Sequence, residues 1–324
     1  MTRTITRRAL GGAAIGLLAA RTARAAQPEE IRIDWATYNP VSLILKDQEL
    51  LEKEFAKDNI KIRWVMSAGS NKALEFLNAG SIDFGSTAGS AALVAKINGN
   101  PIKSIYVYSR PEWTALVTTK DSAIKSIADL KGKRVAVTRG TDPHIFLVRA
   151  LLGAGLTEKD ITPVLLQHAD GKTALIRGDV DAWAGLDPMM AAAEVEDGAK
   201  LFFRNAAANT WGILNVREDF AKQNPELVKR VLAVYEEARK YSLANPNEVK
   251  ADFIAVTKLP DAVVEKQLKE RTELTHSKIG APQRESILAA GIALQQAGVI
   301  KADVDVKKVV DDLIDPQYLA APTN

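Results

Sequence analysis

Residues 81–95, which read SIDFGSTAGSAALVA, decide the fold class. The apolar residues Ile82 and Phe84 are followed by small residues over 85–89 and then by a helix-forming run over 90–95. This order is typical of a strand that passes directly into a helix. The first N–H groups of such a helix have no intrahelical acceptor, so they can bind an anion. An ordinary strand-to-helix turn explains the same residues without a ligand.

The same order of strand, small polar loop and helix recurs before this stretch. Residues 31–35 and 60–65 have the pattern of strands, and residues 42–55 and 72–78 have the apolar spacing of helices. Strands that alternate with helices predict an α/β fold with mostly parallel sheets. Ligands of such sheets bind beyond the carboxyl ends of the strands.

A weak internal repeat predicts that the chain forms two similar lobes. Residues 77–83 (LNAGSID) align with residues 175–181 (LIRGDVD), and each is followed by a strand, a loop and an alanine-rich helix. The extended apolar segments 113–119 and 211–216 are the expected crossings, so we predict a hinge of two strands. The first lobe then holds 26–115 and 216–324, where a helix over 225–243 packs back on it, and the second lobe holds 116–215.

The first 25 residues are predicted to be an export signal. Arg7 and Arg8 precede a run of small and apolar residues, and Ala23-Arg24-Ala25 forms an A-x-A cleavage site. The arginine pair favours the twin-arginine route. Removal of this segment takes away five arginines and leaves 38 basic against 40 acidic residues, a net charge of −2. We therefore expect an exported, soluble periplasmic protein.

Composition disfavours several classes of function. No block of Lys and Arg remains that would neutralise several phosphates, so we expect no nucleic-acid binding. The sequence has no Cys, which excludes disulfides, thiolate chemistry and a lipid-carrying Cys at the cleavage site. The three histidines lack metal-ligand spacing, and Leu166 stands where a phosphate loop ending in Gly171-Lys172-Thr173 needs Gly. We expect no metal, no cofactor and no enzyme activity.

Two Asp-Pro pairs are predicted to begin helices. Asp142-Pro143 and Asp187-Pro188 each place an N-cap residue before Pro at the first helical position. A capping carboxylate occupies the donors that an anion needs, so loops 86–90 and 67–70 are the better anion sites. Arg110 and Arg139 lie near the expected cleft and are candidates for charge-assisted bonds. Trp113 and Trp211 are candidate cleft walls, whereas Trp183 is expected in the core.

Three stretches resemble the solute-binding proteins of ABC importers for aliphatic sulfonates, within the wider nitrate, sulfonate and taurine binding group. They are residues 77–87 (LNAGSIDFGST), residues 124–133 (IKSIADLKGK) and Asp181-Ala182-Trp183-Ala184 followed by Asp187-Pro188. The resemblance implies a two-lobed periplasmic binding protein of type II that closes on a small organic anion. It also implies delivery of that anion to a membrane permease driven by a cytoplasmic ATPase. The small residues over 85–89 would then let backbone N–H groups approach a sulfonate oxygen.

The sequence departs from the family pattern at several positions. Ala36 stands where sulfonate binders carry Gln, Ala88-Gly89 replaces Gly-Asp, and Asp142 replaces a small neutral residue. Residues 185–186 and 189–190 replace aromatic residues, which predicts a roomier pocket and a sulfonate with a bulkier apolar tail. The rival ligand is a zwitterion such as taurine, with Asp142 or Asp187 binding its amine; a carboxylate or a nitrate-like anion are further alternatives.

Two other functional classes remain open at this point. A thiamine-pyrimidine-synthase-like enzyme shares the architecture but uses a cysteine-rich motif, and a sensory binding protein would feed a receptor instead of a permease. If the chain is the binding protein of an importer, His144, at a helix start, is a further candidate ligand-binding residue. The expected ligand-binding residues are Tyr38, Asn39, Ser67, Gly69, Ser70, Ser86, Thr87, Ala88, Gly89, Ser90, Arg110, Trp113, Arg139, Thr141, Asp142, His144, Asp187 and Trp211.

Overall fold

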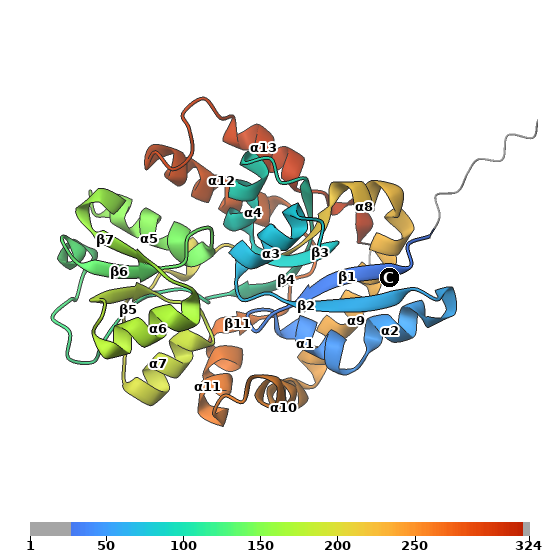
Figure 1. Ribbon diagram of the computed structural model, residues 1–324, viewed down its shortest axis with the longest axis horizontal. Helices are drawn as coiled ribbons and strands as arrows, with labels where there is room; N and C mark the ends of the chain where they lie inside the picture. Colours follow the sequence, from blue (N-terminus) through green and yellow to red (C-terminus); the bar gives the residue numbers. More distant parts are fainter. Residues whose placement is uncertain (1–26, 320–324) are drawn as a thin grey trace, which may run out of the picture.

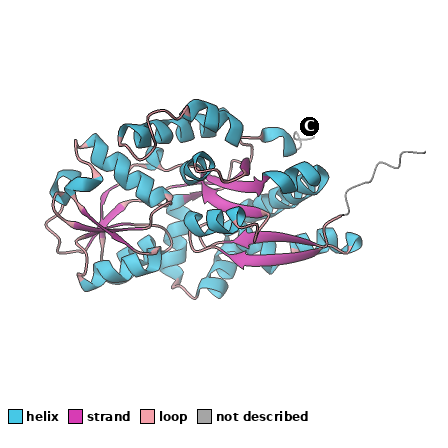
Figure 2. Ribbon diagram, turned by 45° about the horizontal axis from the view of Figure 1, so that its top comes forward, coloured by secondary structure: helices cyan, strands magenta, loops and turns pink. Residues whose placement is uncertain are grey.

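The computed structural model describes residues 27–319, and the expected export signal lies outside this range. The chain forms two α/β lobes side by side, each built on its own sheet (Figure 1). Helices cover both faces of each sheet, as the view coloured by secondary structure shows (Figure 2). The predicted two-lobed α/β architecture is confirmed.

The first sheet has the strand order β11-β4-β10-β3-β1-β2. Strand β1 pairs in parallel with β2 and β3, whereas β10 runs antiparallel between β3 and β4. Its strands are β1 (Glu30–Trp35), β2 (Lys61–Met66), β3 (Phe84–Ala88), β4 (Ile102–Pro111), β10 (Gly212–Arg217) and β11 (Thr272–Glu273).

The second sheet has the order β7-β6-β8-β5-β9 and repeats the design of the first. Strand β6 pairs in parallel with β7 and β8, and β5 runs antiparallel between β8 and β9. In each sheet the one antiparallel inner strand is the strand that enters from the other lobe. The strands are β5 (Leu116–Thr118), β6 (Arg134–Val137), β7 (Thr162–Leu165), β8 (Ala182–Ala184) and β9 (Lys200–Phe203).

The weak repeat in the sequence corresponds to the same hydrogen-bonded corner in both lobes. Asp83 accepts from the backbone N–H of Arg32 and pairs with its guanidinium, which also donates to the carbonyl of Gly80. Asp181 does the same with Arg134, and Gly178 takes the place of Gly80. Both glycines have positive φ, 66° and 78°, which favours Gly. The alignment of 77–83 with 175–181 therefore has a physical basis.

The helices begin largely where the sequence predicted. Pro occupies the first turn of five of them, where its missing N–H costs nothing. The region 42–55 was expected as one helix but forms two, because Glu49 adopts a left-handed conformation with φ of 50°. The helices are α1 (Pro40–Asp47), α2 (Leu50–Phe55), α3 (Ser70–Asn78), α4 (Gly89–Ile97), α5 (Asp142–Gly153), α6 (His168–Arg177), α7 (Met189–Asp197), α8 (Glu218–Gln223), α9 (Pro225–Ala244), α10 (Pro246–Thr257), α11 (Asp261–Glu265), α12 (Ala281–Gln296) and α13 (Val306–Leu313).

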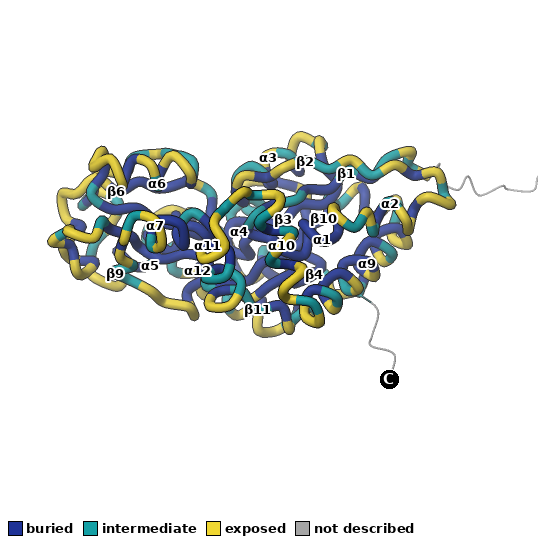
Figure 3. The backbone as a smooth tube through the Cα atoms, turned by 90° about the horizontal axis from the view of Figure 1, so that it is seen from below, coloured by how far each residue is buried: buried dark blue, intermediate teal, exposed yellow. Residues whose placement is uncertain are grey.

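Each lobe buries its own core, and apolar contacts join the lobes at their boundary. One large cluster fills the first lobe on both faces of its sheet, and α9 packs back on this lobe against α1 and α2 as expected. This cluster also takes in Ile145, Val148 and Leu186 of the second lobe. Two smaller clusters cover the faces of the second sheet, and Trp183 is fully buried in one of them, as predicted. The burial view shows the dark interior of each lobe and its exposed rim (Figure 3).

Two extended segments connect the lobes. The first runs from the end of β4 to β5, and the second from β9 to β10. They are tied together because Thr114 N–H donates to Asn209 Oδ1 at 2.9 Å. Strand β10 pairs with β3 and β4 along its length, so residues 212–215 lie in the first sheet, whereas the sequence analysis assigned them to the second lobe. The remaining limits of the lobes stay our proposal.

Candidate functional site

The loops that follow the parallel strands of the two sheets meet at the boundary between the lobes. Ser90, at the start of α4, hydrogen bonds to Asp142 of the second lobe. Gly69, before α3, lies against His168 at the start of α6. These contacts bring the predicted loops 67–70 and 86–90 to one interface with residues 141–142. The candidate site is therefore the junction of strand ends that the fold class implies.

A buried carboxylate on β1 holds the middle of β3 in place. Asp34 Oδ1 accepts from both the N–H and the hydroxyl of Ser86 at 2.8 Å. Asn39 donates to Ser86 Oγ at 2.9 Å, and Tyr38 donates to the Ser86 carbonyl at 3.0 Å. Burial raises the pKa of Asp34 to about 6, although the bonds from Ser86 oppose this rise. Ser86, Asn39 and Tyr38 thus form the framework of the site.

The start of α4 does not present open donors to a ligand. The N–H groups of Ala88, Gly89 and Ser90 donate to Ser70 Oγ, the Trp211 carbonyl and Thr210 Oγ1, respectively. The hydroxyl of Thr87 accepts from Asn215 on β10 and so faces the sheet. The N–H groups of residues 88–90 are therefore not free to bind an anion in this structure, because each already has a protein acceptor.

The small residues over 85–89 are required by packing. A Cβ on Gly89 would lie 2.6 Å from the side chain of Ile287 on α12, and a Cβ on Gly85 would lie 2.8 Å from Leu77. Both distances are too short for van der Waals contact. Close packing against neighbouring helices is therefore enough to explain both glycines, without a sulfonate oxygen beside them.

Asp142 does not cap its own helix, which corrects the sequence prediction. Thr141 is the N-cap residue of α5, and its hydroxyl donates to the Thr138 carbonyl. The Asp142 carboxylate instead accepts from Ser90 Oγ, Trp113 Nε1 and both the N–H and the hydroxyl of Thr210, at 2.7–3.0 Å. The competing donors come from other parts of the chain, which the local Asp-Pro pattern does not reveal.

Open donors lie instead at the start of α3. Within residues 27–319, the N–H groups of Ser70 and Asn71 donate to no protein acceptor. The buried hydroxyl of Ser67 makes no hydrogen bond of normal geometry there, although it lies close enough to Asp34 to lower the pKa of that carboxyl. The first-turn N–H groups of a helix favour an anion. Of the two predicted anion loops, 67–70 is the one that retains free donors.

His168 faces this helix start from the second lobe and was not singled out by the sequence analysis. Its Nε2 would be 3.0 Å from a Cβ on Gly69, so Gly69 is the point of closest approach between the loops. The Thr138 hydroxyl donates to the Leu166 carbonyl, so His168 Nδ1 carries the proton that joins it to Thr138 Oγ1 at 3.2 Å. Burial lowers the pKa of His168 to about 3, and its Nε2 is a neutral acceptor without a partner.

Aromatic rings line the first connecting segment. Trp113 lies edge-on to Tyr38 and beside Tyr108, with ring centres 6.0 and 6.4 Å apart. Trp211 on the second segment contacts His276 and the guanidinium of Arg110. Both tryptophans are almost fully buried, as expected of residues between the lobes.

The two predicted arginines lie at the surface. Arg110 is exposed and approaches Glu273, and Arg139 is exposed and approaches Glu158. His144 also contacts Glu158, at 3.1 Å. Arg139 and His144 line a groove between α4, α5 and α12. Gly140 lines the same groove, and a Cβ on it would be 3.7 Å from Asn71 Cβ at the start of α3. Contact of Arg110, Arg139 and His144 with a ligand remains a prediction.

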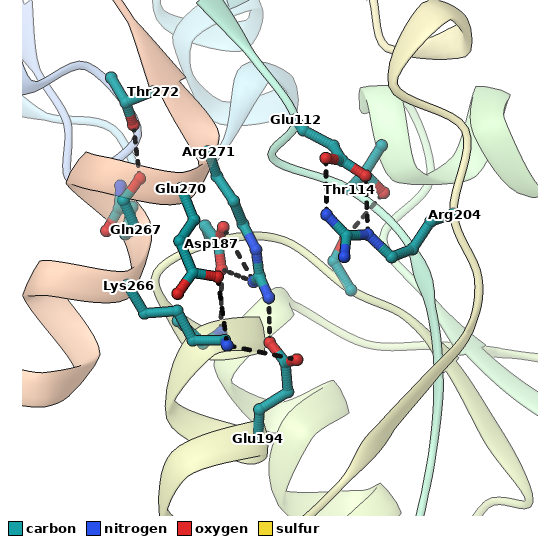
Figure 4. Close-up of polar contacts among 12 residues, drawn as sticks. Glu112, Thr114, Asp187, Glu194, Arg204, Lys266, Gln267, Glu270, Arg271 and Thr272 are labelled. Carbon is teal, nitrogen blue, oxygen red and sulfur yellow. Dashed lines mark hydrogen bonds and ion pairs between the residues drawn. The ribbon is translucent and has the colours of Figure 1, made fainter.

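A buried ion cluster joins the lobes beside the connecting segments (Figure 4). Arg271, which precedes β11 in the first lobe, pairs with Asp187 at 3.1 Å and with Glu194 on α7 of the second lobe. Asp187 also accepts from Ala191 N–H, but the N-cap residue of α7 is Pro188 and the helix begins at Met189, so the prediction of Asp187 as the cap with Pro at the first helical position was wrong. Burial raises the pKa of Asp187 to about 6, against the effect of Arg271. Arg271 was missed because its partners lie 77 and 84 positions away in sequence.

Neither a metal site nor a membrane span was found in the part of the chain that the structure describes. No group of three or more His, Cys, Asp or Glu side chains within residues 27–319 is placed to hold a metal ion. No helix in the same range is long and apolar enough to cross a membrane.

The chain is similar to proteins that bind sulfonates. It is 32% identical over 271 residues to a putative aliphatic sulfonates-binding protein of Escherichia coli, covering 82% of this chain and 84% of that protein. A putative aliphatic sulfonates-binding protein of Bacillus subtilis is 29% identical, over 88% of this chain and 87% of that one. The alkanesulfonate-binding protein SsuA of Xanthomonas axonopodis pv. citri, solved with bound MOPS, superposes with a TM-score of 0.81 and 28% identity, covering 90% of this chain and 100% of that structure.

A family profile agrees with these similarities. Residues 54–249 match the NMT1/THI5-like family. This range begins within α2 and ends within α10, so it includes both connecting segments and the whole second lobe. The chain therefore belongs to the NMT1/THI5-like family, and it has the fold of the periplasmic solute-binding proteins within it.

Proposed function

We propose that this chain is the substrate-binding component of an ABC importer and that it binds a small sulfonate between its two lobes. The similarity to sulfonate-binding proteins over more than four fifths of the chain carries the proposal. In this proposal residues 1–25 direct export, by the twin-arginine route, to the periplasm. The loaded protein then delivers its ligand to a membrane permease driven by an ATPase.

The open donors at the start of α3 support a sulfonate at this end of the site. A sulfonate is a strong acid that stays ionised at all physiological pH values, so it needs donors and no proton acceptor. The N–H groups of Ser70 and Asn71 and the hydroxyl of Ser67 supply such donors. Neutral donors of this kind stabilise a buried anion when they are already oriented toward it. We place the sulfonate oxygens there and the apolar tail toward the aromatic rings around Trp113.

Thermal melting of the mature, refolded protein against a panel of small acids tests this function. The panel pairs alkanesulfonates, taurine and aromatic sulfonates with carboxylates of the same shape, and adds nitrate and sulfate. A ligand at about 100 times its dissociation constant stabilises the folded state by about 2.7 kcal/mol. We expect stabilisation by sulfonates. Stabilisation by carboxylates or nitrate alone would contradict the proposed substrate.

A matched pair of variants tests whether the ligand binds between the lobes. The Gly69→Val side chain would clash with His168, where a Cβ alone already comes to 3.0 Å, and would keep the lobes apart. Gly153→Val adds the same side chain where no atom lies within 4 Å of the Cβ. We expect Gly69→Val to abolish the sulfonate-dependent shift and Gly153→Val to retain it. Retention in both variants would place the ligand elsewhere.

One observation favours a second candidate, an aminosulfonate. Within residues 27–319, His168 Nε2 is a buried acceptor without a donor and Asp34 Oδ2 has only the nearby hydroxyl of Ser67, whereas Asp142 and Asp187 bind several protein donors. An ammonium group would satisfy Asp34. Taurine and ethanesulfonate differ only in this group. If taurine is the ligand class, Asp34→Asn weakens taurine binding and spares ethanesulfonate; an equal effect on both would exclude Asp34 as the amine site.

A further inference from the structure

We infer that Asp142 is a built-in anion, which fills an anion-binding site at the start of α4 and thereby holds the two lobes together without a ligand. This inference concerns the empty protein and does not depend on the sulfonate proposed above. It rests on the donors around one carboxylate and on the parts of the molecule from which those donors come.

The carboxylate has a complete set of donors. Asp142 Oδ2 accepts from Trp113 Nε1 at 2.8 Å and from the N–H of Thr210 at 3.0 Å. Asp142 Oδ1 accepts from the hydroxyls of Ser90 and Thr210, both at 2.7 Å. The indole and backbone N–H groups can only donate, so Oδ2 is always an acceptor. Four donors around two oxygens are what an isolated carboxylate or a similar oxyanion needs when it leaves water.

The donors and the carboxylate belong to different parts of the molecule. Ser90 is in the first lobe, Trp113 and Thr210 are on the two connecting segments, and Asp142 begins α5 of the second lobe. The group is almost fully buried, with 2% of Asp142 exposed. Separation of the lobes would break the bond to Ser90 and would change the geometry at both connecting segments. Without the Asp142 carboxylate, a diffusible anion would be needed to accept from these donors and bridge the lobes.

The charges around this carboxylate do not provide a competing partner. Arg149, in the second half of α5, interacts electrostatically with Asp142, but its guanidinium donates to the Ala208 carbonyl. Burial raises the pKa of Asp142, while the bonds from Ser90, Trp113 and Thr210 lower it. The hydrogen bonds, and no ion pair, are therefore the main compensation for burying this group. The position is unavailable to the anionic group of a ligand as long as Asp142 occupies it.

Chemical rescue tests the inference directly. Asp142→Ala removes the carboxylate and leaves its donors, whereas Asp142→Asn keeps the site filled with an uncharged group of the same shape. Melting temperatures are measured in sodium formate against sodium chloride at equal ionic strength. We expect formate to raise the melting temperature of Asp142→Ala in a saturable way. Wild type and Asp142→Asn should show no formate-specific rise, because the side chain itself leaves no room for formate. The Asn amide accepts through one oxygen only, so it fills the space but cannot satisfy all four donors that join the lobes.

Small-angle scattering supplies a second readout that does not need the alanine variant to fold. The ligand-free wild type should be compact, Asp142→Asn should have a larger radius of gyration, and Asp181→Ala should match wild type. Asp181 is a fitting control because its carboxylate binds Arg134 within one lobe. A formate effect equal in wild type and Asp142→Ala, or an unchanged radius in Asp142→Asn, would overturn the inference. Neither measurement uses a sulfonate, so both are independent of the proposed substrate.

Discussion

Three buried polar side chains at strand ends define the site at the scale of single residues. Asp34, Asp142 and His168 are each at most 2% exposed. Asp34 accepts from Ser86 of β3 and fixes it. Asp142 bridges the lobes, and His168 presents a neutral ring to Gly69. Burying a polar group lowers the free energy of unfolding unless the group is hydrogen-bonded. Buried polar residues of this kind therefore indicate a candidate functional site.

His168 is expected to make the protein sensitive to acid. Its pKa is about 3 in the folded protein and about 6.5 in the unfolded chain, so the unfolded chain binds more protons between these values. Stability is therefore lost as the pH falls below about 6.5, by roughly 1.4 kcal/mol per pH unit from this residue alone. We predict that His168→Gln lacks this loss.

Urea unfolding at pH 7 and pH 5 measures the effect. The stability of wild type relative to His168→Gln should fall by about 2 kcal/mol between these pH values. Asp34 and Asp187 also titrate in this range, with raised pKa values, so they favour the folded state as the pH falls. They are present in both proteins and cancel in the comparison. Parallel pH profiles of the two proteins would refute the assignment.

At the scale of elements, close packing explains features that looked like ligand chemistry. Gly89 begins α4 at the point where Ile287 of α12 crosses it. The Arg32–Asp83 contact joins β1 to the turn before β3, and the Arg134–Asp181 contact joins β6 to the turn before β8. Both features are stable without a ligand. They position the loop ends with the precision that a binding site requires.

Gly89→Ala is expected to destabilise the contact between α4 and α12. A Cβ would be 2.6 Å from Ile287, and overpacking of this kind costs about 1–3 kcal/mol. Ile287→Ala in the same chain removes the clash, so the double variant should lose less stability than the sum of the two single changes.

A double-mutant cycle by urea unfolding checks this prediction, with Gly153→Ala as the matched control. No atom lies within 4 Å of a Cβ at Gly153, so this change should be neutral or stabilise by up to about 1 kcal/mol. Additive losses at Gly89 and Ile287 would show that the two positions do not clash.

At the scale of the whole molecule, polar contacts join the lobes at two places. Asp142 bonds across the boundary beside α4, and Arg271 pairs with Asp187 and Glu194 beside the connecting segments. Apolar packing joins them as well, because Ile145, Val148 and Leu186 of the second lobe lie in the core cluster of the first. Opening by rotation about a hinge would have to break contacts of both kinds.

Arg271→Met is expected to cost more than removal of a neighbouring surface pair. Arg271 is 4% exposed, and its loss leaves the buried carboxylate of Asp187 without a cation, which typically costs about 3–5 kcal/mol, whereas Glu194 keeps its pair with Lys266. Arg204 forms a comparable bidentate pair with Glu112, at 2.8–2.9 Å, but its side chain is half-exposed (Figure 4).

The control Arg204→Met should therefore lose only about 0–1 kcal/mol. Urea unfolding of the two variants gives the comparison. Asp187→Asn combined with Arg271→Met should recover part of the loss, because the amide needs no cation. Equal losses for Arg204→Met and Arg271→Met would mean that burial does not control the strength of these pairs.

The sequence by itself determined the two lobes, the order of strands and helices, and the loops at which they meet. These follow from apolar periodicity, Gly and Pro positions and a repeat of seven residues, all of which act over short distances along the chain. The resemblance to sulfonate binders depended on the same local stretches. Tyr38, Asn39, Ser86 and Ser67 were placed at the strand ends correctly, and their contact with a ligand remains a prediction.

Only the tertiary structure decided which donors stay open and which carboxylates are engaged. Asp142 lies 52 positions from Ser90 and 68 from Thr210, and Arg271 lies 84 positions from Asp187. The expected cap at Asp142 was wrong because such distant donors outcompete the local ones once the lobes meet. Arg110 and Arg139 are exposed and His144 is buried beside Glu158, and contact of these three residues with a ligand remains a prediction. Side chains next to one another in sequence share a loop, but they share a binding site only if the packing of the lobes turns them toward it.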